Sequence, residues 1–163
     1  MMQRILTIFA ALFAVSAPVA AQDSRVVLNT ASAQTIIETC QAWAVERDLR
    51  VNIAVYDQGV DLIGFLRMDG APLASIQIAQ WKGESAAGIN FSTGALAGFA
   101  TENPVLAHAP AIAVLRGGVP ILAIDGTHIG GVGVSGASSE DDEHCAVAAI
   151  EAAGLVANLP AEE

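Results

Sequence analysis

Positive charge is scarce in this sequence. Its 163 residues include 7 lysines and arginines against 17 aspartates and glutamates, which gives a formal net charge of −10 at pH 7. A protein this acidic is repelled by the phosphates of nucleic acids and by anionic lipid surfaces. The sequence also lacks a basic stripe and any cluster of basic with aromatic residues. We therefore expect no nucleic-acid partner.

Cysteine is rarer still: the sequence contains two, Cys40 and Cys145. The chain has no C-x-x-C pair, no G-x-S-x-G elbow and no S-x-x-K motif, so the usual signatures of thiol redox enzymes and serine hydrolases are missing. Two cysteines either pair in an oxidising compartment or remain separate buried thiols. The sequence leaves both alternatives open.

An apolar run near the N-terminus extends from Ile5 to Val15, directly after the positively charged Arg4. It is shorter than the roughly 20 residues that a membrane-spanning helix needs. Small residues at Val19 and Ala21 suit cleavage by signal peptidase, so we predict a removable signal peptide over residues 1–21. The alternative is an uncleaved membrane anchor. With cleavage, the protein is expected in the periplasm or outside the cell, without membrane insertion.

Residues 22–163 have the length of one domain with a hydrophobic core, and they contain no internal repeat or linker. Hydrophobic periodicity predicts alternating helices and strands along them. Thr30 is expected to cap the first helix, whose apolar face carries Ala33, Ile36, Ile37, Cys40 and Ala44. The predicted helices span 30–48, 72–87, 93–101 and 138–153, and the predicted strands span 51–56, 60–67, 111–115, 119–124 and 127–134.

Turn signals between successive strands, such as Asp125-Gly126, indicate hairpins and hence a mainly antiparallel sheet. Helices before, between and after the strands can cover both faces of that sheet. The predicted fold class is therefore α/β, in the α+β sense. If the first and last helices share a face, Cys40 and Cys145 approach each other.

Residues 131–136 match the pattern G-x-G-x-x-G of dinucleotide-binding sites. We reject that interpretation because the chain ends soon after the following helix, so no βαβ unit can form. Carboxylates at the start of that helix would also repel a pyrophosphate. The glycines are better explained as positions where backbones pack closely.

Carboxylates open the last predicted helix, followed by a histidine: Glu140, Asp141, Asp142, Glu143 and His144. One interpretation is a site for a hard cation or iron, with Glu140 and His144 four residues apart on one helix face. The other is compensation of the helix dipole on a solvated face.

Lys82 is the one lysine of the chain, and Trp81 precedes it. A lone lysine near a loop that carries Arg67 and Asp69 could hold a carboxylate or a propionate. The alternative is a surface lysine whose apolar stem lies along the protein.

An ordered set of motifs resembles a known family. The motifs are Arg67-Met68-Asp69-Gly70-Ala71, Lys82, Gly117-Gly118-Val119-Pro120-Ile121, Asp125-Gly126, Gly133-Val134-Ser135-Gly136-Ala137 and Asp142-Glu143-His144-Cys145-Ala146. Together they identify residues 28–155 as similar to the GlcG/HbpS-like proteins, also called haem-degrading-domain or PduO C-terminal-like proteins.

The resemblance implies a profilin-like fold, with a five-stranded antiparallel sheet flanked by helices. It also implies homo-oligomers and, in some members, binding of haem or a related tetrapyrrole. One exported branch acts as an accessory to a sensor protein, which would be a partner. A ligand site is then expected at Arg67, Met68, Asp69, Lys82, Gly117, Gly118, Ser135 and Gly136.

Three functions follow from these observations. The first is an exported haem-binding protein, with His108, His128 or His144 as the iron ligand and Lys82 or Arg67 beside the propionates. The second is a sensor or binding module for small organic acids, without haem. The third is an enzyme of haem breakdown, for which Asp69, Lys82 and Asp142 are the candidate acids and bases. We expect a binding protein rather than an enzyme.

Overall fold

The computed structural model describes residues 24–159; the predicted signal peptide over residues 1–21 lies outside this range. The helices are α1 (Thr30–Glu46), α2 (Ala74–Ile89), α3 (Thr93–Glu102) and α4 (Ser139–Ala152), with a 3-10 turn, η1 (Pro104–His108). The strands are β1 (Asn52–Asp57), β2 (Leu62–Arg67), β3 (Gly118–Leu122), β4 (His128–Ser135) and β5 (Val156–Ala157). None of the described helices is long and apolar enough to cross a bilayer.

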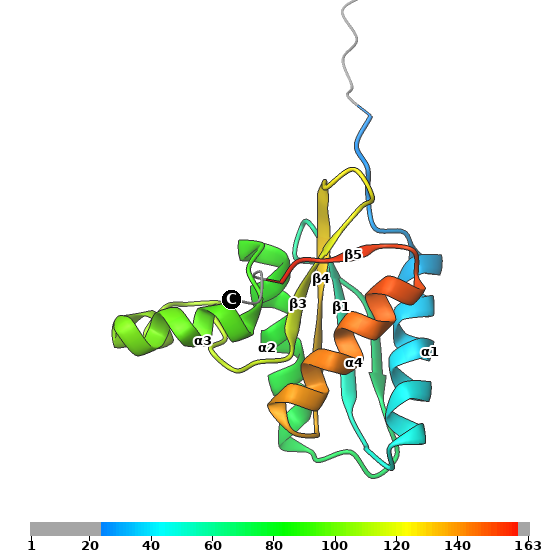
Figure 1. Ribbon diagram of the computed structural model, residues 1–163, viewed down its shortest axis with the longest axis horizontal. Coiled ribbons are helices and arrows are strands. Elements are labelled where there is room, and N and C mark those ends of the chain that lie inside the picture. The colour runs from blue at the N-terminus through cyan, green and yellow to red at the C-terminus, as the bar shows by residue number, and fades with distance from the viewer. Residues whose placement is uncertain (1–23, 160–163) are drawn as a thin grey trace, which may run out of the picture.

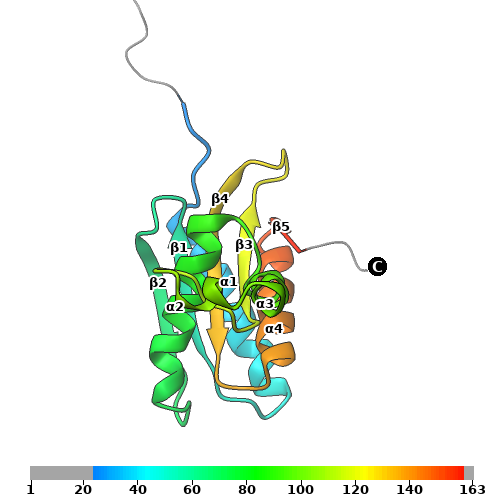
Figure 2. The ribbon, with the colours of Figure 1, turned by 90° about the vertical axis from the view of Figure 1, so that its left-hand side faces the viewer.

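The strands form one antiparallel sheet in the order β2-β1-β4-β3-β5. Helices α1 and α4 cover one face and α2 covers the other, while α3 projects from the body as an arm (Figures 1 and 2). Alternate residues of each strand point to opposite faces. The predicted fold class is confirmed.

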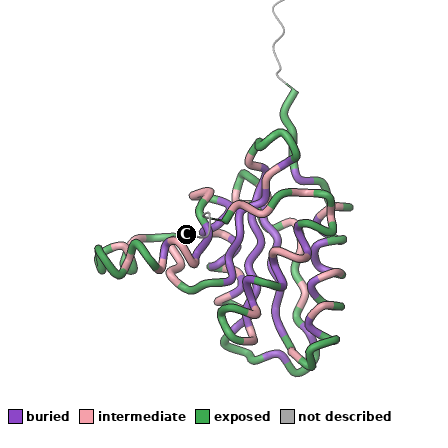
Figure 3. The backbone as a smooth tube through the Cα atoms, viewed as in Figure 1, coloured by how far each residue is buried: buried purple, intermediate pink, exposed green. Residues whose placement is uncertain are grey.

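The main core lies between the sheet and the α1–α4 pair. Ile53, Val55, Val132 and Val134 are fully buried there, against residues such as Ile36 of α1. Burial is concentrated in the strands and the inner sides of these helices, whereas most of the α3 arm is exposed or half-buried (Figure 3).

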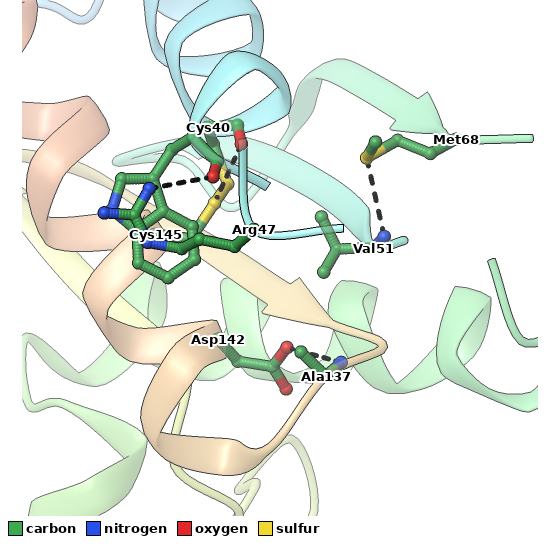
Figure 4. Close-up of a disulfide and its surroundings, with 8 residues drawn as sticks. Cys40, Arg47, Val51, Met68, Ala137, Asp142 and Cys145 are labelled. Atoms are coloured by element: carbon green, nitrogen blue, oxygen red, sulfur yellow. Dashed lines mark hydrogen bonds between the residues drawn. A yellow bond between two sulfur atoms is a disulfide. The ribbon is translucent and has the colours of Figure 1, made fainter. Parts of the chain in front are cut away.

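A disulfide joins Cys40 of α1 to Cys145 of α4, with 5.1 Å between their Cα atoms (Figure 4). Both cysteines are fully buried. Of the two alternatives that the sequence left open, the structure therefore contains the paired one. The bond closes a separation of 105 residues, and it clamps the two helices that share the main core.

On the opposite face, α2 packs directly on the glycines of β4. A Cβ atom at Gly131 would lie 2.5 Å from the backbone nitrogen of Ala87, and one at Gly133 would collide with the backbone of Ala79 and Gly83. Real Cβ atoms do not approach backbone this closely. The prediction that these glycines serve close backbone packing is confirmed.

The predicted strand at 111–115 is wrong, and with it the expected three-stranded meander. Ala111 has a φ of +57°, outside the β region. The backbone groups bond to side chains instead: the N–H of Ala113 donates to Ser85 Oγ at 3.1 Å, and the C=O of Leu115 accepts from Thr93 Oγ1 at 2.6 Å. The fifth strand is β5, whose Ala157 pairs with Ile121 of β3.

The expected helix starts also need correction. Asn29, rather than Thr30, caps α1, because its Oδ1 accepts from the N–H of Ser32 at 2.8 Å. Pro72 precedes α2 instead of lying in its first turn, and its C=O accepts from the N–H of Ser75 at 3.2 Å. Both predictions were wrong by one or two residues, the usual uncertainty of a helix boundary.

Candidate functional site

Lys82 and Asp142 form a buried ion pair that connects the two helical layers. Lys82 comes from α2 and Asp142 from the first turn of α4, and Lys82 Nζ lies 2.9 Å from Asp142 Oδ2. Their side chains are 2% and 3% exposed. Lys82 Nζ also donates to the C=O of Val134 at 2.9 Å, and Asp142 Oδ1 accepts from the N–H of Ala137 at 3.0 Å.

Gly117 makes room for this pair at the end of the sheet. Its φ of +117° belongs to the region that favours glycine. A Cβ atom at this position would lie 2.8 Å from Lys82 Nζ, from Asp142 Cβ and from the C=O of Val134. Gly117 is therefore required both by its backbone conformation and by the side chains around it.

Glu143 is a second buried carboxylate, next to the first along α4. It is 9% exposed; its Oε1 lies 3.5 Å from Arg116 Nε, and its Oε2 has no hydrogen-bond partner among the described residues. Burial raises the pKa of both carboxyls. Lys82 opposes the rise in the pKa of Asp142, and Arg116 opposes the rise in the pKa of Glu143.

Of the two interpretations of carboxylates 140–143, these findings correct the one that places all of them on a solvated face. Glu140 is exposed and Asp141 half-buried, whereas Asp142 and Glu143 point into the protein. Asp141 accepts from Ser138 Oγ at 2.7 Å, and Ser138 Oγ in turn accepts from the N–H of Asp141, which caps α4.

An apolar pocket of about 340 Å³ opens on the outer side of α2. One wall is α2 itself, which contributes Ile78, Trp81 and Glu84 from successive turns. The other wall is the segment Ala111–Leu115, which Ser85 and Thr93 hold in place through the two hydrogen bonds described above. Trp81 is 55% exposed, so its ring is open to solvent beside the pocket.

A family model described as "Haem degrading protein HbpS-like" matches residues 28–151. Protein GlcG of Escherichia coli K12 is 35% identical over 113 residues, which are 69% of this chain and 84% of GlcG. The chain belongs to the HbpS-like family. Its fold supports the assignment: the crystal structure of a double mutant of Streptomyces reticuli HbpS superposes with a TM-score of 0.76 at 29% identity, covering 87% of this chain and 97% of the other.

A crystal structure of a PduOC–haem complex superposes with a TM-score of 0.75 at 24% identity, covering 80% of this chain and 97% of the other. At that identity, the likeness shows the fold alone. The HbpS-like fold is thus common to proteins that have diverged widely in sequence.

The expected ligand residues of this HbpS-like chain divide into two groups in space. Lys82, Gly117, Gly118 and Ser135 come together, all buried, around the end of β3 and β4. A Cβ atom at Gly118 would lie 2.6 Å from Thr93 Cγ2 and would collide with the backbone of Lys82. This group is a packing centre rather than an open site, and the interpretation of Lys82 as a surface residue is wrong.

The second group lies at the end of edge strand β2, two strands away from β4. Arg67 and Asp69 are exposed, whereas Met68 is buried and its sulfur accepts from the N–H of Val51 at 3.5 Å (Figure 4). Gly136, with a φ of +144°, packs against Arg50 and Val51. None of the eight expected ligand residues lines the apolar pocket.

The three histidines are far from equivalent. His108 is exposed at the end of η1, three residues before the pocket wall, and His144 is exposed on α4, on the other face of the sheet. His128 is half-buried with Nε2 2.9 Å from the C=O of Gly130, and burial lowers its pKa. Within residues 24–159, no three His, Cys, Asp or Glu side chains gather as a metal site would require.

Sequence reasoning missed the pocket residues Ile78, Trp81 and Glu84. A signal was present, because these residues recur every three positions on the predicted helix and therefore share a face. That face carries apolar groups on the side of α2 opposite to the buried Ala79 and Ala86. When a helix already packs on a sheet through one side, apolar residues on its outer side indicate a second surface that another group can cover.

Proposed function

We propose that this protein is an exported binding protein for haem or a related tetrapyrrole. The observation that carries the proposal is the pocket between α2 and Ala111–Leu115, which is lined mainly by apolar groups and bordered by the exposed Trp81. The family description, and the haem bound by the structurally similar PduOC, support the choice of ligand class. At about 340 Å³ the pocket is at the small end of ligand sites. It would hold one edge of a macrocycle and leave the rest exposed.

The residues that flank the pocket wall in the chain would supply the other groups that such a ligand needs. Haem needs apolar contacts for its ring, an axial ligand for iron and polar surroundings for its propionates. His108 would supply the axial nitrogen, since it is exposed and close to the pocket wall in the chain. Arg116, half-exposed directly after Leu115, is the cation that would face the propionates. Lys82 is unsuited to this role because Asp142 already occupies it.

A haemin titration followed by absorbance tests this function. The purified protein lacking residues 1–21 is expected to give a saturable Soret shift. His108→Ala should weaken or abolish the shift, whereas His144→Ala, which removes an exposed histidine on the opposite face, should leave it unchanged. A featureless, non-saturating response would overturn the proposal, and an unchanged shift in His108→Ala would overturn the choice of ligand residue.

Export is the second part of the proposal. The N-terminal sequence supports it, and so does the buried Cys40–Cys145 disulfide, because disulfides persist in oxidising compartments. The mass of the protein recovered from the periplasm or the medium should correspond to cleavage after Ala21. A full-length protein confined to the cytoplasm would contradict this part.

Self-association and a sensor partner complete the proposal. The α3 arm and its surroundings expose the large apolar residues Phe91, Phe99 and Val105, and the rings of Phe91 and Phe99 meet edge to face at 5.9 Å. Exposed apolar patches of this kind favour association. Light scattering should give a multiple of the monomer mass that falls in Phe99→Ser; a monomeric wild type would contradict it. An accessory role in redox or haem sensing would use the same oligomer.

A further inference from the structure

The pocket beside α2 is distinguished by its charge as well as by its apolar lining. Its lining consists of Ile78, Trp81 and Glu84 from α2 and of the segment Ala111–Leu115. Glu84 is the one ionisable residue among them, and it is half-buried. A ligand that enters the pocket therefore meets hydrocarbon, an indole ring and a single negative charge.

The two basic residues nearest in the chain do not offset that charge. Lys82 follows Trp81, but its ammonium group is turned to the interior, where it bonds Asp142 and the C=O of Val134. Arg116 follows Leu115, but its Nε lies 3.5 Å from Glu143 Oε1. Neither residue lines the pocket. An anionic group placed next to Glu84 would thus find repulsion without a local cation.

The influence of Glu84 extends to the sheet beneath α2. Tyr56, which is buried between β1 and α2, has a raised pKa, chiefly because of burial and also because of the negative charge of Glu84. A partly buried carboxylate acts on its neighbours more strongly than one in open water, because fewer water molecules screen it. The net charge of −10 adds a long-range attraction for cations.

We infer that this pocket is a site for planar apolar cations, with Trp81 as the aromatic contact and Glu84 as the counter-charge. An aromatic face beside a carboxylate is a favourable setting for a cation, since the ring quadrupole and the carboxylate attract the same sign of charge. The segment Ala111–Leu115 covers the apolar body of the ligand from the other side.

The inference deepens the proposed function, because it concerns the same pocket. A tetrapyrrole would have to enter with the edge that lacks propionates, which keeps its negative groups away from Glu84. Glu84 is then the residue that sets both the orientation of a tetrapyrrole and the preference for cations among smaller planar ligands.

Berberine, a planar aromatic cation whose fluorescence rises in apolar surroundings, is a direct probe. The full mature protein should bind it saturably at low salt, and more tightly than it binds the anionic apolar dye 1-anilinonaphthalene-8-sulfonate. Glu84→Gln should weaken berberine binding by about two- to fivefold, the effect of one partly exposed ion pair. The charge reversal Glu84→Arg should invert the preference in favour of the anionic dye.

Two controls separate local from general effects. Glu151→Gln removes an exposed charge on α4, on the other side of the sheet, and should leave berberine binding unchanged. Trp81→Leu keeps the pocket apolar but removes the aromatic face, and should weaken berberine more than the anionic dye. Unfolding temperatures close to that of the wild type would show that each variant is folded.

Equal berberine binding by the wild type and Glu84→Gln would overturn the inference, as would a wild-type preference for the anionic dye. Haemin titrations of the wild type keep the two proposals distinguishable, because the haemin response is measured independently of both dyes. Berberine binding without a haemin response would remove the haem proposal and leave the cation site. A haemin response together with dye binding that does not depend on the charge of the dye would remove the cation site and leave the haem proposal.

Discussion

The two faces of the sheet are covered in contrasting ways. On the α1–α4 face, large aliphatic side chains fill the space between helices and strands, and a disulfide locks the two helices together. On the α2 face, glycines of β4 let the helix backbone approach the strand backbone directly, and apart from Tyr56 the buried apolar side chains are alanines, such as Ala54 and Ala79.

The contrast shows how one sheet supports both a core and a site. The thick aliphatic layer supplies most of the buried apolar area, which is the main source of stability. The thin layer needs little side-chain volume between α2 and β4, so the large residues Ile78 and Trp81 of α2 are available on its outer side. The Lys82–Asp142 pair joins the two layers around the end of the sheet.

Loss of the Lys82–Asp142 ion pair should have the largest effect on stability. Lys82→Met leaves the carboxylate of Asp142 buried without its counter-charge, which should lower the free energy of unfolding by about 3–5 kcal/mol. Chemical denaturation measures the loss. The double variant Lys82→Met, Asp142→Leu removes both charges and should recover most of it. A single variant as stable as the wild type would show that the pair does not connect the layers energetically.

Loss of the Cys40–Cys145 disulfide should have the second-largest effect on stability. Replacing both Cys40 and Cys145 by alanine should cost about 2–4 kcal/mol, because the unfolded chain regains the freedom of a long loop. Hydrogen exchange should then accelerate in α1 and α4 more than in α2. A uniform acceleration over both faces would contradict the idea that the clamp serves one face.

Helix capping offers a finer comparison between the faces. Ser138 caps α4 through its hydroxyl, whereas Leu73 precedes α2 without a side-chain cap. Ser138→Ala should cost about 1 kcal/mol, and Leu73→Ala should change stability very little, since Leu73 is 70% exposed. Thermal unfolding of the two alanine variants measures the difference. Equal losses would show that the cap of α4 adds nothing to its packing.

The smallest expected effect is a pH dependence. Because the folded protein raises the pKa of Glu143, the native state binds its proton more tightly than the unfolded state does. Stability from this group is therefore present at acidic pH and lost as pH rises through the raised pKa. Glu143→Gln should be slightly more stable than the wild type at neutral pH, by less than about 1 kcal/mol, and should show a shallower decline.

Denaturation midpoints measured from mildly acidic to neutral pH provide the check, with Glu151→Gln as the control for loss of a charge. Asp142 has a raised pKa as well and contributes in the same direction, so the slope should shrink rather than vanish. Identical pH profiles for the wild type and Glu143→Gln would contradict the prediction.

Local pattern was sufficient for most of the fold. The apolar spacing of Ala33, Ile36, Ile37, Cys40 and Ala44 predicted the buried face of α1, and all five are buried. The alternation in residues 51–56 predicted β1, and Asp125-Gly126 predicted the β3–β4 turn. The strand prediction failed at 111–115 because a run of small apolar residues satisfies strand periodicity whether or not a neighbouring strand is present.

The candidate site was less predictable for a related reason. Lys82 was noticed as unusual, but its partner is 60 residues away on another helix, and no local pattern connects the two. Asp142 and Glu143 have the same residue types as their neighbours Glu140, which is exposed, and Asp141, which is half-buried. Which carboxylates turn inward depends on how α4 is oriented against β3 and β4.

The sequence by itself determined most of the helical and extended segments, the antiparallel arrangement and membership of the family, because these depend on periodicity, turn chemistry and ordered motifs. The tertiary structure decided that Cys40 meets Cys145, that Lys82 is neutralised by Asp142, and that Ala111–Leu115 forms a pocket wall instead of a strand. Each of these results depends on contacts between segments far apart in the chain, and such contacts form only when whole layers pack together.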